Sequence, residues 1–167
     1  MFLVAISIGI YSYLVYFIGL FGLLHTQNLF LISITYLCFV FYLFKKKINN
    51  LQKLLENFKK LKKDRLTNIF ILTIISQAGV NLIGVLGPEL GFDALWYHLT
   101  IPKIYLENHS VFYIPGGLLY YSAMPKLIEM VYVAGLAFGD EVFPKLIHFF
   151  FGILSLIALC KLSLKFF

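Results

Sequence analysis

Two acidic side chains, Asp93 and Glu89, stand in the part of this 167-residue sequence best suited to chemistry. That stretch, residues 88–124, separates two long apolar segments, is not basic, and holds two His and the only Trp. A carboxylate that is partly desolvated at a lipid–water boundary has a raised pKa and becomes a better general base. We therefore predict Asp93 as a catalytic base, with Glu89 as a second catalytic candidate four residues earlier.

Both acids also have plain structural interpretations. Asp93 follows Gly-Phe and precedes ALWYHL, where an N-cap would contribute about 0.5–2 kcal/mol. Glu89 fits a solvated loop charge, because Glu is mostly exposed in proteins. Two carboxylates this close could share a metal, but no third ligand and no Cys/His spacing is evident. We predict no metal site and no cofactor, and leave divalent-metal dependence open.

Cations and aromatic rings complete the predicted site. A phosphate-bearing ligand would need some of the cations Lys145, Lys126 and Lys103, whose alternative is to extend toward lipid headgroups. On one straight helix His98 would point away from Asp93, which favours packing over catalysis. The predicted walls of the pocket are Trp96, Tyr97, His98 and Tyr120.

Composition places the chain in a lipid bilayer. A mean hydropathy of +0.87 with 13% charged residues is too apolar for a soluble domain of this length. A spanning helix needs about 20 residues. We predict an all-α polytopic membrane protein with about four transmembrane helices, plus interfacial helices in the first large outer loop. The expected spans are 2–24, 29–44, 68–87 and 142–160, with His25 to Asn28 as the turn of an N-terminal hairpin at 1–44.

The charge distribution predicts the orientation. Nine of the 14 Lys and Arg lie between Lys45 and Arg65, and basic loops stay in the cytoplasm. This predicts a multi-pass cell-membrane protein with both termini cytoplasmic and the loop 88–140 extracytoplasmic. Residues 45–66 read as an amphipathic helix that binds anionic lipids of the inner leaflet. Nothing besides charge suggests a nucleic-acid partner, so none is predicted.

The outer loop is expected to contain three short helices. Phe92, Leu95 and Trp96 share a face at helical spacing with Leu99, which predicts a helix along the membrane surface. Thr100 can cap a second helix that runs through Leu106. The apolar segment 125–139 has only 15 residues and contains Lys126 and Glu129, so we predict a helix at the outer interface rather than a fifth span. Ser122 or Pro125 would open it and Gly139 would close it.

This order of motifs resembles the start of the GT-C membrane glycosyltransferases. The residues that carry the resemblance are Pro-x-x-x-Phe-Asp-Ala-Leu-Trp-Tyr-His-Leu from Pro88, Pro-Lys-x-Tyr-Leu from Pro102, a Pro/Tyr-rich stretch, and a span with a basic residue near its start. The chain is more closely similar to bacterial and archaeal relatives of the family-39 protein mannosyltransferases and of the lipid A aminoarabinose transferases. The similarity covers about residues 68–165, so that 67–167 would be the start of the GT-C module.

The resemblance implies transfer of a sugar from a polyprenyl-phosphate carrier to an acceptor on the outer face. In that family a carboxylate of the first outer loop accepts or orients the acceptor proton, and Asp93 matches it. Many members follow that Asp with Glu, where this chain has Ala94. An Arg near the start of the next span contacts the donor phosphate, and Lys145 matches it with the charge but without the two-pronged geometry.

The family's catalytic module has several more spans than this sequence. We therefore expect an N-terminal portion that is inactive alone and whose partners are the bilayer, the polyprenyl-phosphate-linked sugar and the missing C-terminal part. Three alternatives stay open: a non-catalytic membrane subunit or scaffold, a fragment of a transporter, or a pore-forming protein. For a transporter the nearest mid-membrane candidates are Gln77, Gly79 and Asn81. The first two spans lack the polar face that a pore needs.

Overall fold

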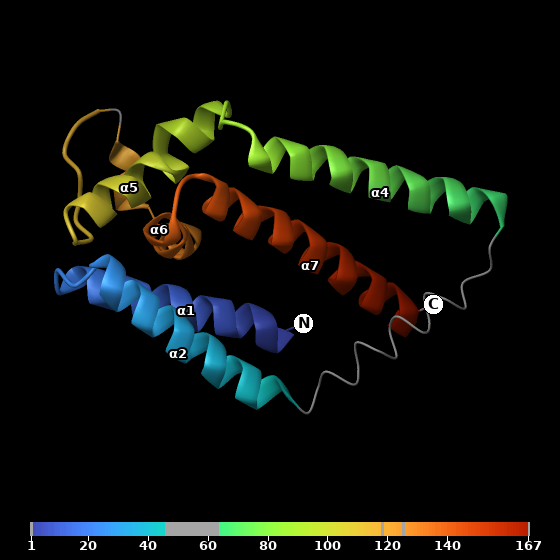
Figure 1. Cartoon of the computed structure of the whole chain (residues 1–167), viewed down its shortest axis with the longest axis horizontal. Coiled ribbons are helices and arrows are strands. Elements are labelled where there is room, and N and C mark those ends of the chain that lie inside the picture. Colours follow the sequence, from blue (N-terminus) through green and yellow to red (C-terminus); the bar gives the residue numbers. More distant parts are fainter. Residues whose placement is uncertain (1, 46–63, 118, 125, 167) are drawn as a thin grey trace.

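The computed structural model of the chain describes residues 2–45, 64–117, 119–124 and 126–166 (Figure 1). Every regular element in these ranges is helical, which confirms the predicted all-α fold. Four helices are long and apolar enough to cross a membrane: α1 (Phe2–Leu20), α2 (Thr26–Phe44), α4 (Arg65–Leu86) and α7 (Val142–Phe166). The predicted basic helix at 45–66 falls almost entirely on residues outside the described ranges.

The remaining elements lie between α4 and α7. They are the π-helical turn η2 (Ala94–His98), α5 (Thr100–Glu107), the 3-10 turn η3 (Tyr120–Ala123) and α6 (Leu127–Phe138). Residues 111–115 have no regular secondary structure. The three predicted short helices are thus present, but the first contains a π turn in which the Leu99 amide donates to the Ala94 carbonyl at 2.9 Å. Thr100 does not cap α5, since its hydroxyl donates back to the Leu95 carbonyl.

The turn between α1 and α2 comes earlier than the sequence suggests. Helix α1 ends at Leu20 rather than at residue 24, and Gly22 has φ +71°, a conformation that glycine adopts without strain. Helix α2 then begins at Thr26, so the predicted turn residues Thr26 to Asn28 are already helical. The Asn28 side chain donates to the Leu23 carbonyl at 3.0 Å and closes the turn.

The four long helices form two antiparallel pairs, α1 with α2 and α4 with α7 (Figure 1). The short elements gather at one end of the molecule. The start of α1, the end of α2, the start of α4 and the end of α7 all point away from that end. The segment between α4 and α7 and the two chain termini thus lie at opposite ends of the helices.

The core of the molecule is built around α6. Its residues from Met130 to Gly135 are all buried, and it packs against α1, α2, α5 and α7. The main cluster of buried apolar residues is drawn from α1, α2, α5, α6 and two loops. It comprises Val15, Leu24, Leu29, Ile101, Tyr105, Val111, Met130 and Val133. A helix that is apolar on all sides belongs in a protein interior. The structure makes α6 the centre of a core shared by the N-terminal hairpin and the segment between α4 and α7, a role that the sequence did not predict.

Backbone hydrogen bonds join the α1–α2 turn to the loop after α5. The Leu24 amide donates to the His109 carbonyl, and the Val111 amide donates to the Gly19 carbonyl, both at 3.0 Å. The Ser110 hydroxyl donates to the same Gly19 carbonyl at 3.1 Å. A Cβ atom at Gly19 would collide with the Val111 side chain, so glycine is needed for this close approach.

We predict that Gly19→Ala lowers the free energy of unfolding by about 1–3 kcal/mol, because the extra methyl overpacks a buried contact. The measurement is unfolding of the whole chain in detergent micelles, followed by Trp96 fluorescence. Gly9→Ala is the matched control on the same helix, since a Cβ there meets nothing within 4 Å. Equal effects of the two substitutions would show that the turn–loop contact does not need glycine.

Candidate functional site

Asp93 is exposed and its carboxylate has no partner in the described part of the chain. Its backbone is helical, with φ −64° and ψ −36°, and its side chain caps no helix. The N-cap interpretation of Asp93 is therefore wrong: the helical segment already begins at Phe92. No hydrogen bond or ion pair connects Asp93 to another described residue, which leaves the carboxylate available as a base.

Most other described acids of the outer loop and its borders are engaged. Each of the following holds a hydrogen bond or an ion pair: Glu89, Glu129, Asp140 and Glu141. Glu107 shares with Asp93 the absence of a described partner, but it lies exposed at the end of α5. Asp93 differs from Glu107 because its charge acts on two neighbouring tyrosines of the loop, Tyr97 and Tyr121.

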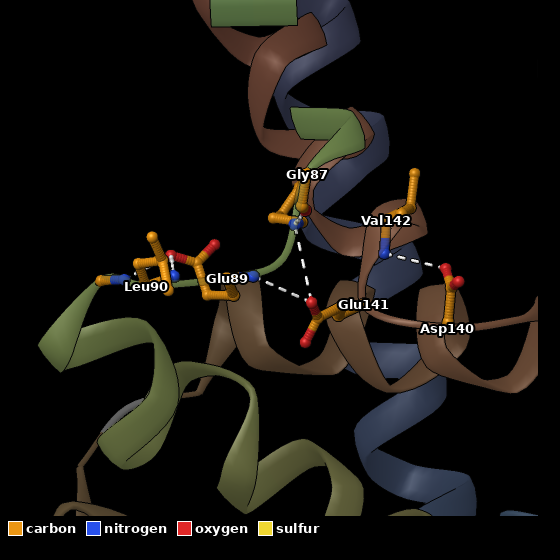
Figure 2. Close-up of polar contacts among 8 residues, drawn as sticks. Gly87, Glu89, Leu90, Asp140, Glu141 and Val142 are labelled. Carbon is orange, nitrogen blue, oxygen red and sulfur yellow. Dashed lines mark hydrogen bonds and ion pairs between the residues drawn. The ribbon is translucent and has the colours of Figure 1, made fainter. Parts of the chain in front are cut away.

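Glu89 lies at the junction of α4 and α7, close to Gly87 and Glu141 (Figure 2). The Glu89 carboxylate accepts hydrogen bonds from the amides of Leu90 and Gly91, at 3.1 and 2.7 Å. Its own amide donates to the carboxylate of Glu141 at 2.9 Å. Glu89 therefore orders the loop that follows α4 and is not the solvated charge that its residue type suggested.

Lys145 is drawn into the same junction. Its ammonium donates to the Gly87 carbonyl at the end of α4 and lies 3.8 Å from Glu141, and its side chain is only 11% exposed. A cation at a helix C-terminus interacts favourably with the helix dipole. Lys145 thus neutralises a helix end, forms no ion pair with Asp93, and has a structural role that the sequence did not predict.

Five rings next to Asp93 form what we call the outer aromatic cluster: Phe92, Trp96, Tyr97, Tyr120 and Tyr121. Tyr121 is its centre. The Tyr121 ring stacks on Tyr97 with centroids 4.3 Å apart and on Tyr120 at 4.2 Å, and it meets Trp96 edge-on at 5.1 Å. All four predicted wall residues are therefore brought together, since the His98 ring lies 4.1 Å from the Tyr97 ring. Tyr121 was missed, although it directly follows Tyr120 in the sequence.

Two phenols of the cluster have raised pKa values. Burial raises the pKa of Tyr97, and the charge of Asp93 raises it further. A hydrogen bond with Tyr120, together with burial and nearby charge that includes Asp93, raises the pKa of Tyr121 to about 12. Both phenols therefore act as neutral hydrogen-bond donors beside the Asp93 carboxylate at physiological pH.

His98 also makes a polar contact outside the outer aromatic cluster. Its Nδ1 lies 2.9 Å from the Glu129 carboxylate, which connects η2 to the buried helix α6. The sequence predicted interfacial packing for His98 and did not predict this polar contact. The role of Glu129 was missed, although a lone acid in a short apolar helix signals a buried partner.

Lys126 lines a cleft between α1 and the segment that leads into α6. The cleft has a volume of about 420 Å³, and its lining residues are Ser12, Tyr13, Tyr16, Ala123, Met124, Lys126, Leu127 and Met130. The Lys126 ammonium lies 4.8 Å from the centre of the Tyr105 ring, and no described carboxylate comes within 4 Å of it. Burial lowers the pKa of Lys126, and Glu129 partly offsets that effect.

The buried Tyr105 hydroxyl under Lys126 has no hydrogen-bond partner among the described residues. A buried polar group without a partner costs about 1–3 kcal/mol. Lys126, a lining residue of the cleft, thus contacts the ring of a buried tyrosine whose hydroxyl has no described partner. Lys126 is therefore the most suitable of the three predicted cations for holding an anion, while Lys103 is exposed on α5.

The described residues contain no group of three His, Cys, Asp or Glu side chains that could hold a metal ion. No family model, no curated protein sequence and no solved structure matches this chain. The interpretation of the site consequently depends on the chemistry of its own residues.

We predict that Lys145→Met lowers the free energy of unfolding by about 1–3 kcal/mol, because it leaves the Gly87 carbonyl and Glu141 without their cation. Lys103→Met is the control, since Lys103 is exposed, and it should change stability by less than about 0.5 kcal/mol. Thermal unfolding in micelles measures both. Equal stability of the two variants would contradict a structural role for Lys145.

Proposed function

We propose that this chain is the N-terminal part of an integral membrane glycosyltransferase, which moves a sugar from a polyprenyl-phosphate carrier to an acceptor on the extracytoplasmic face. The observation that carries the proposal is the Asp93 carboxylate. It is exposed, free of described partners and flanked by the outer aromatic cluster. The motif similarity of residues 68–165 to GT-C enzymes supports the same reaction.

In the proposed reaction Asp93 accepts the proton of the acceptor hydroxyl. The acceptor oxygen forms a bond to the anomeric carbon of the sugar while the bond from that carbon to the phosphate oxygen breaks. The electron pair of the broken bond leaves with the phosphate on its lipid carrier. Positioning and neutralisation of charge are what such a reaction needs from the protein.

Lys126 is the residue we assign to the leaving phosphate. Lys145 matches the family's phosphate-binding position, but the Gly87 carbonyl and Glu141 already occupy it. Lys126 lies in a cleft large enough for a phosphate headgroup, has no described ion pair, and is partly desolvated. A desolvated cation gains more from an incoming anion than an exposed one does. Tyr13 and Tyr16 of α1 would form the opposite wall.

An apolar edge beside Asp93 suits contact with the bilayer. Leu90 and Phe92 are 84% and 72% exposed, and Leu95 is also exposed. These side chains would sit among the lipid tails near the headgroups, with the aromatic residues at the boundary. This depth would let a lipid-linked sugar reach Asp93 without leaving the membrane.

The orientation belongs to the same proposal. The basic stretch 45–66 would bind anionic lipids of the cytoplasmic leaflet, which puts both termini in the cytoplasm and the loop 88–140 outside. The spans after residue 167 of a complete enzyme would supply the rest of the carrier groove. One observation favours the alternative of a non-catalytic subunit: Glu89 and Glu141 act at helix ends rather than in a pocket.

Asp93→Asn should abolish sugar transfer in the complete enzyme, because an amide cannot take the acceptor proton. The expected loss is about 10²–10⁴-fold. The assay follows labelled sugar from a polyprenyl-phosphate donor in isolated membranes, with membrane insertion checked by alkali extraction. Glu107→Gln is the matched control, an exposed loop acid that should retain activity. Transfer at the normal rate by the Asp93→Asn variant would remove the assignment.

Lys126→Met should weaken binding of a polyprenyl phosphate to the purified full chain by about tenfold or more, the value of a charge-assisted hydrogen bond. Binding to chain reconstituted in neutral phosphatidylcholine discs is measured with a fluorescent isoprenyl phosphate. Lys103→Met should bind normally. An isoprenyl alcohol tests whether the phosphate is what Lys126 recognises, and equal affinity for both ligands would contradict this role.

A further inference from the structure

One face of α4 carries polar groups that the chain itself does not cover. No residue of α4 is buried. Gln77 and Asn81, one turn apart in the middle of this span, are exposed, and the Gln77 amide donates to the Asn81 carbonyl oxygen at 2.9 Å. The remaining donors and acceptors of these two amides meet no described residue.

These amides do not face α7. The α4 residues that are least exposed are Thr67, Ala78 and Val85, and they mark the side that packs against α7. At about 100° per residue, Gln77 and Asn81 lie roughly 50–90° around the helix from that side. Figure 1 shows α4 at the edge of the molecule with α7 as its neighbour. The amide face is therefore open to whatever surrounds the protein.

In a bilayer that surrounding is hydrocarbon, which offers no hydrogen bonds. Each amide side chain has two N–H donors and a carbonyl acceptor, and the single bond between Gln77 and Asn81 leaves most of them unused. Polar side chains in transmembrane helices face the interior of a bundle or pair with one another, because exposure to lipid is costly. A second transmembrane helix with hydrogen-bonding groups at the same depth would satisfy them.

We infer that α4 is a self-association surface, through which two copies of this chain pair in the membrane. A second copy fits because an amide is both donor and acceptor and so is complementary to itself. In a parallel pair related by a twofold axis along the membrane normal, Gln77 and Asn81 of each copy come to the same depth. For this chain alone, without the further spans of the proposed complete enzyme, a second copy is the partner that brings an amide to this depth by symmetry.

The neighbouring positions permit close contact between the two helices. Gly84 and Thr73 lie on the same side of α4 as the amides. A Cβ at Gly84 would meet nothing within 4 Å, so the backbone is accessible there. The Thr73 hydroxyl is satisfied by the Ile69 carbonyl at 2.9 Å and presents a small side chain. Small residues of this kind let transmembrane helices approach closely.

The test uses the full chain in phosphatidylcholine vesicles, with Cys38 and Cys160 replaced by Ala. Energy transfer between labelled copies measures self-association as the lipid-to-protein ratio is varied. Gln77→Leu with Asn81→Leu should weaken it by about tenfold or more, since each interhelical hydrogen bond contributes about 0.6–2 kcal/mol. Both substitutions raise the hydropathy of α4, so insertion is retained.

Oxidative cross-linking locates the surface. A Thr73→Cys variant should give a covalent dimer, whereas Leu72→Cys, one residue away but on the far side of α4, should not. Equal cross-linking at the two positions would overturn the proposal. Unchanged self-association of the Gln77→Leu, Asn81→Leu variant, a chain that stays monomeric at every ratio, or a Thr73→Cys adduct with another membrane protein in cells would each overturn it too.

Discussion

The burial of one short helix, α6, is the constraint on which the rest of the arrangement depends. Its six consecutive buried residues, Met130 to Gly135, are covered on different sides by α1, α2, α5 and α7. This packing joins the N-terminal hairpin to the segment between α4 and α7. The cleft at Lys126 exists because α1 and the start of α6 are packed together in this way.

Several charged side chains near the junction of α4 and α7 are engaged at helix ends. Asp140 accepts the amide of Val142 at the start of α7, and Lys145 binds the carbonyl that ends α4. Groups engaged like this cannot take part in chemistry without uncapping a helix. The Asp93 side chain differs from these groups because it caps no helix, and its neighbours are aromatic rings rather than backbone amides.

The fold was largely predictable from the sequence, because spans follow from hydropathy and length alone. The α4 and α7 segments were placed within a few residues, and α6 was placed as a separate short helix. The burial of α6 against other helices was not predictable, since a 15-residue apolar segment has the same hydropathy pattern whether lipid or protein covers it. The wall formed by Tyr13 and Tyr16 was also missed, because the contact joins residues more than 100 positions apart.

The sequence predicted which residues belong to the candidate site better than it predicted which contacts they make. Asp93, Trp96, Tyr97 and Tyr120 do come together in the structure. Glu89 and Lys145 do not join them, because each forms hydrogen bonds with backbone groups close to it. Residue type indicates which side chains are able to react, but local hydrogen bonds determine which of them remain free. Those hydrogen bonds depend on where α4 ends and α7 begins.

The late position of α6 has a consequence for how the chain is made. Helices α1 and α2 leave the ribosome about 100 residues before α6, the helix that packs against both of them. At ~5–20 residues per second this is a delay of roughly 5–20 s. During that interval the pair is held by its own polar contacts, Tyr11 to Ser33 at 2.5 Å and Tyr36 to the Ser7 carbonyl at 2.6 Å. These hydrogen bonds would hold α1 against α2 until α6 is synthesised. Weakening them would leave the unfinished membrane protein more exposed to cellular quality control before its core is complete.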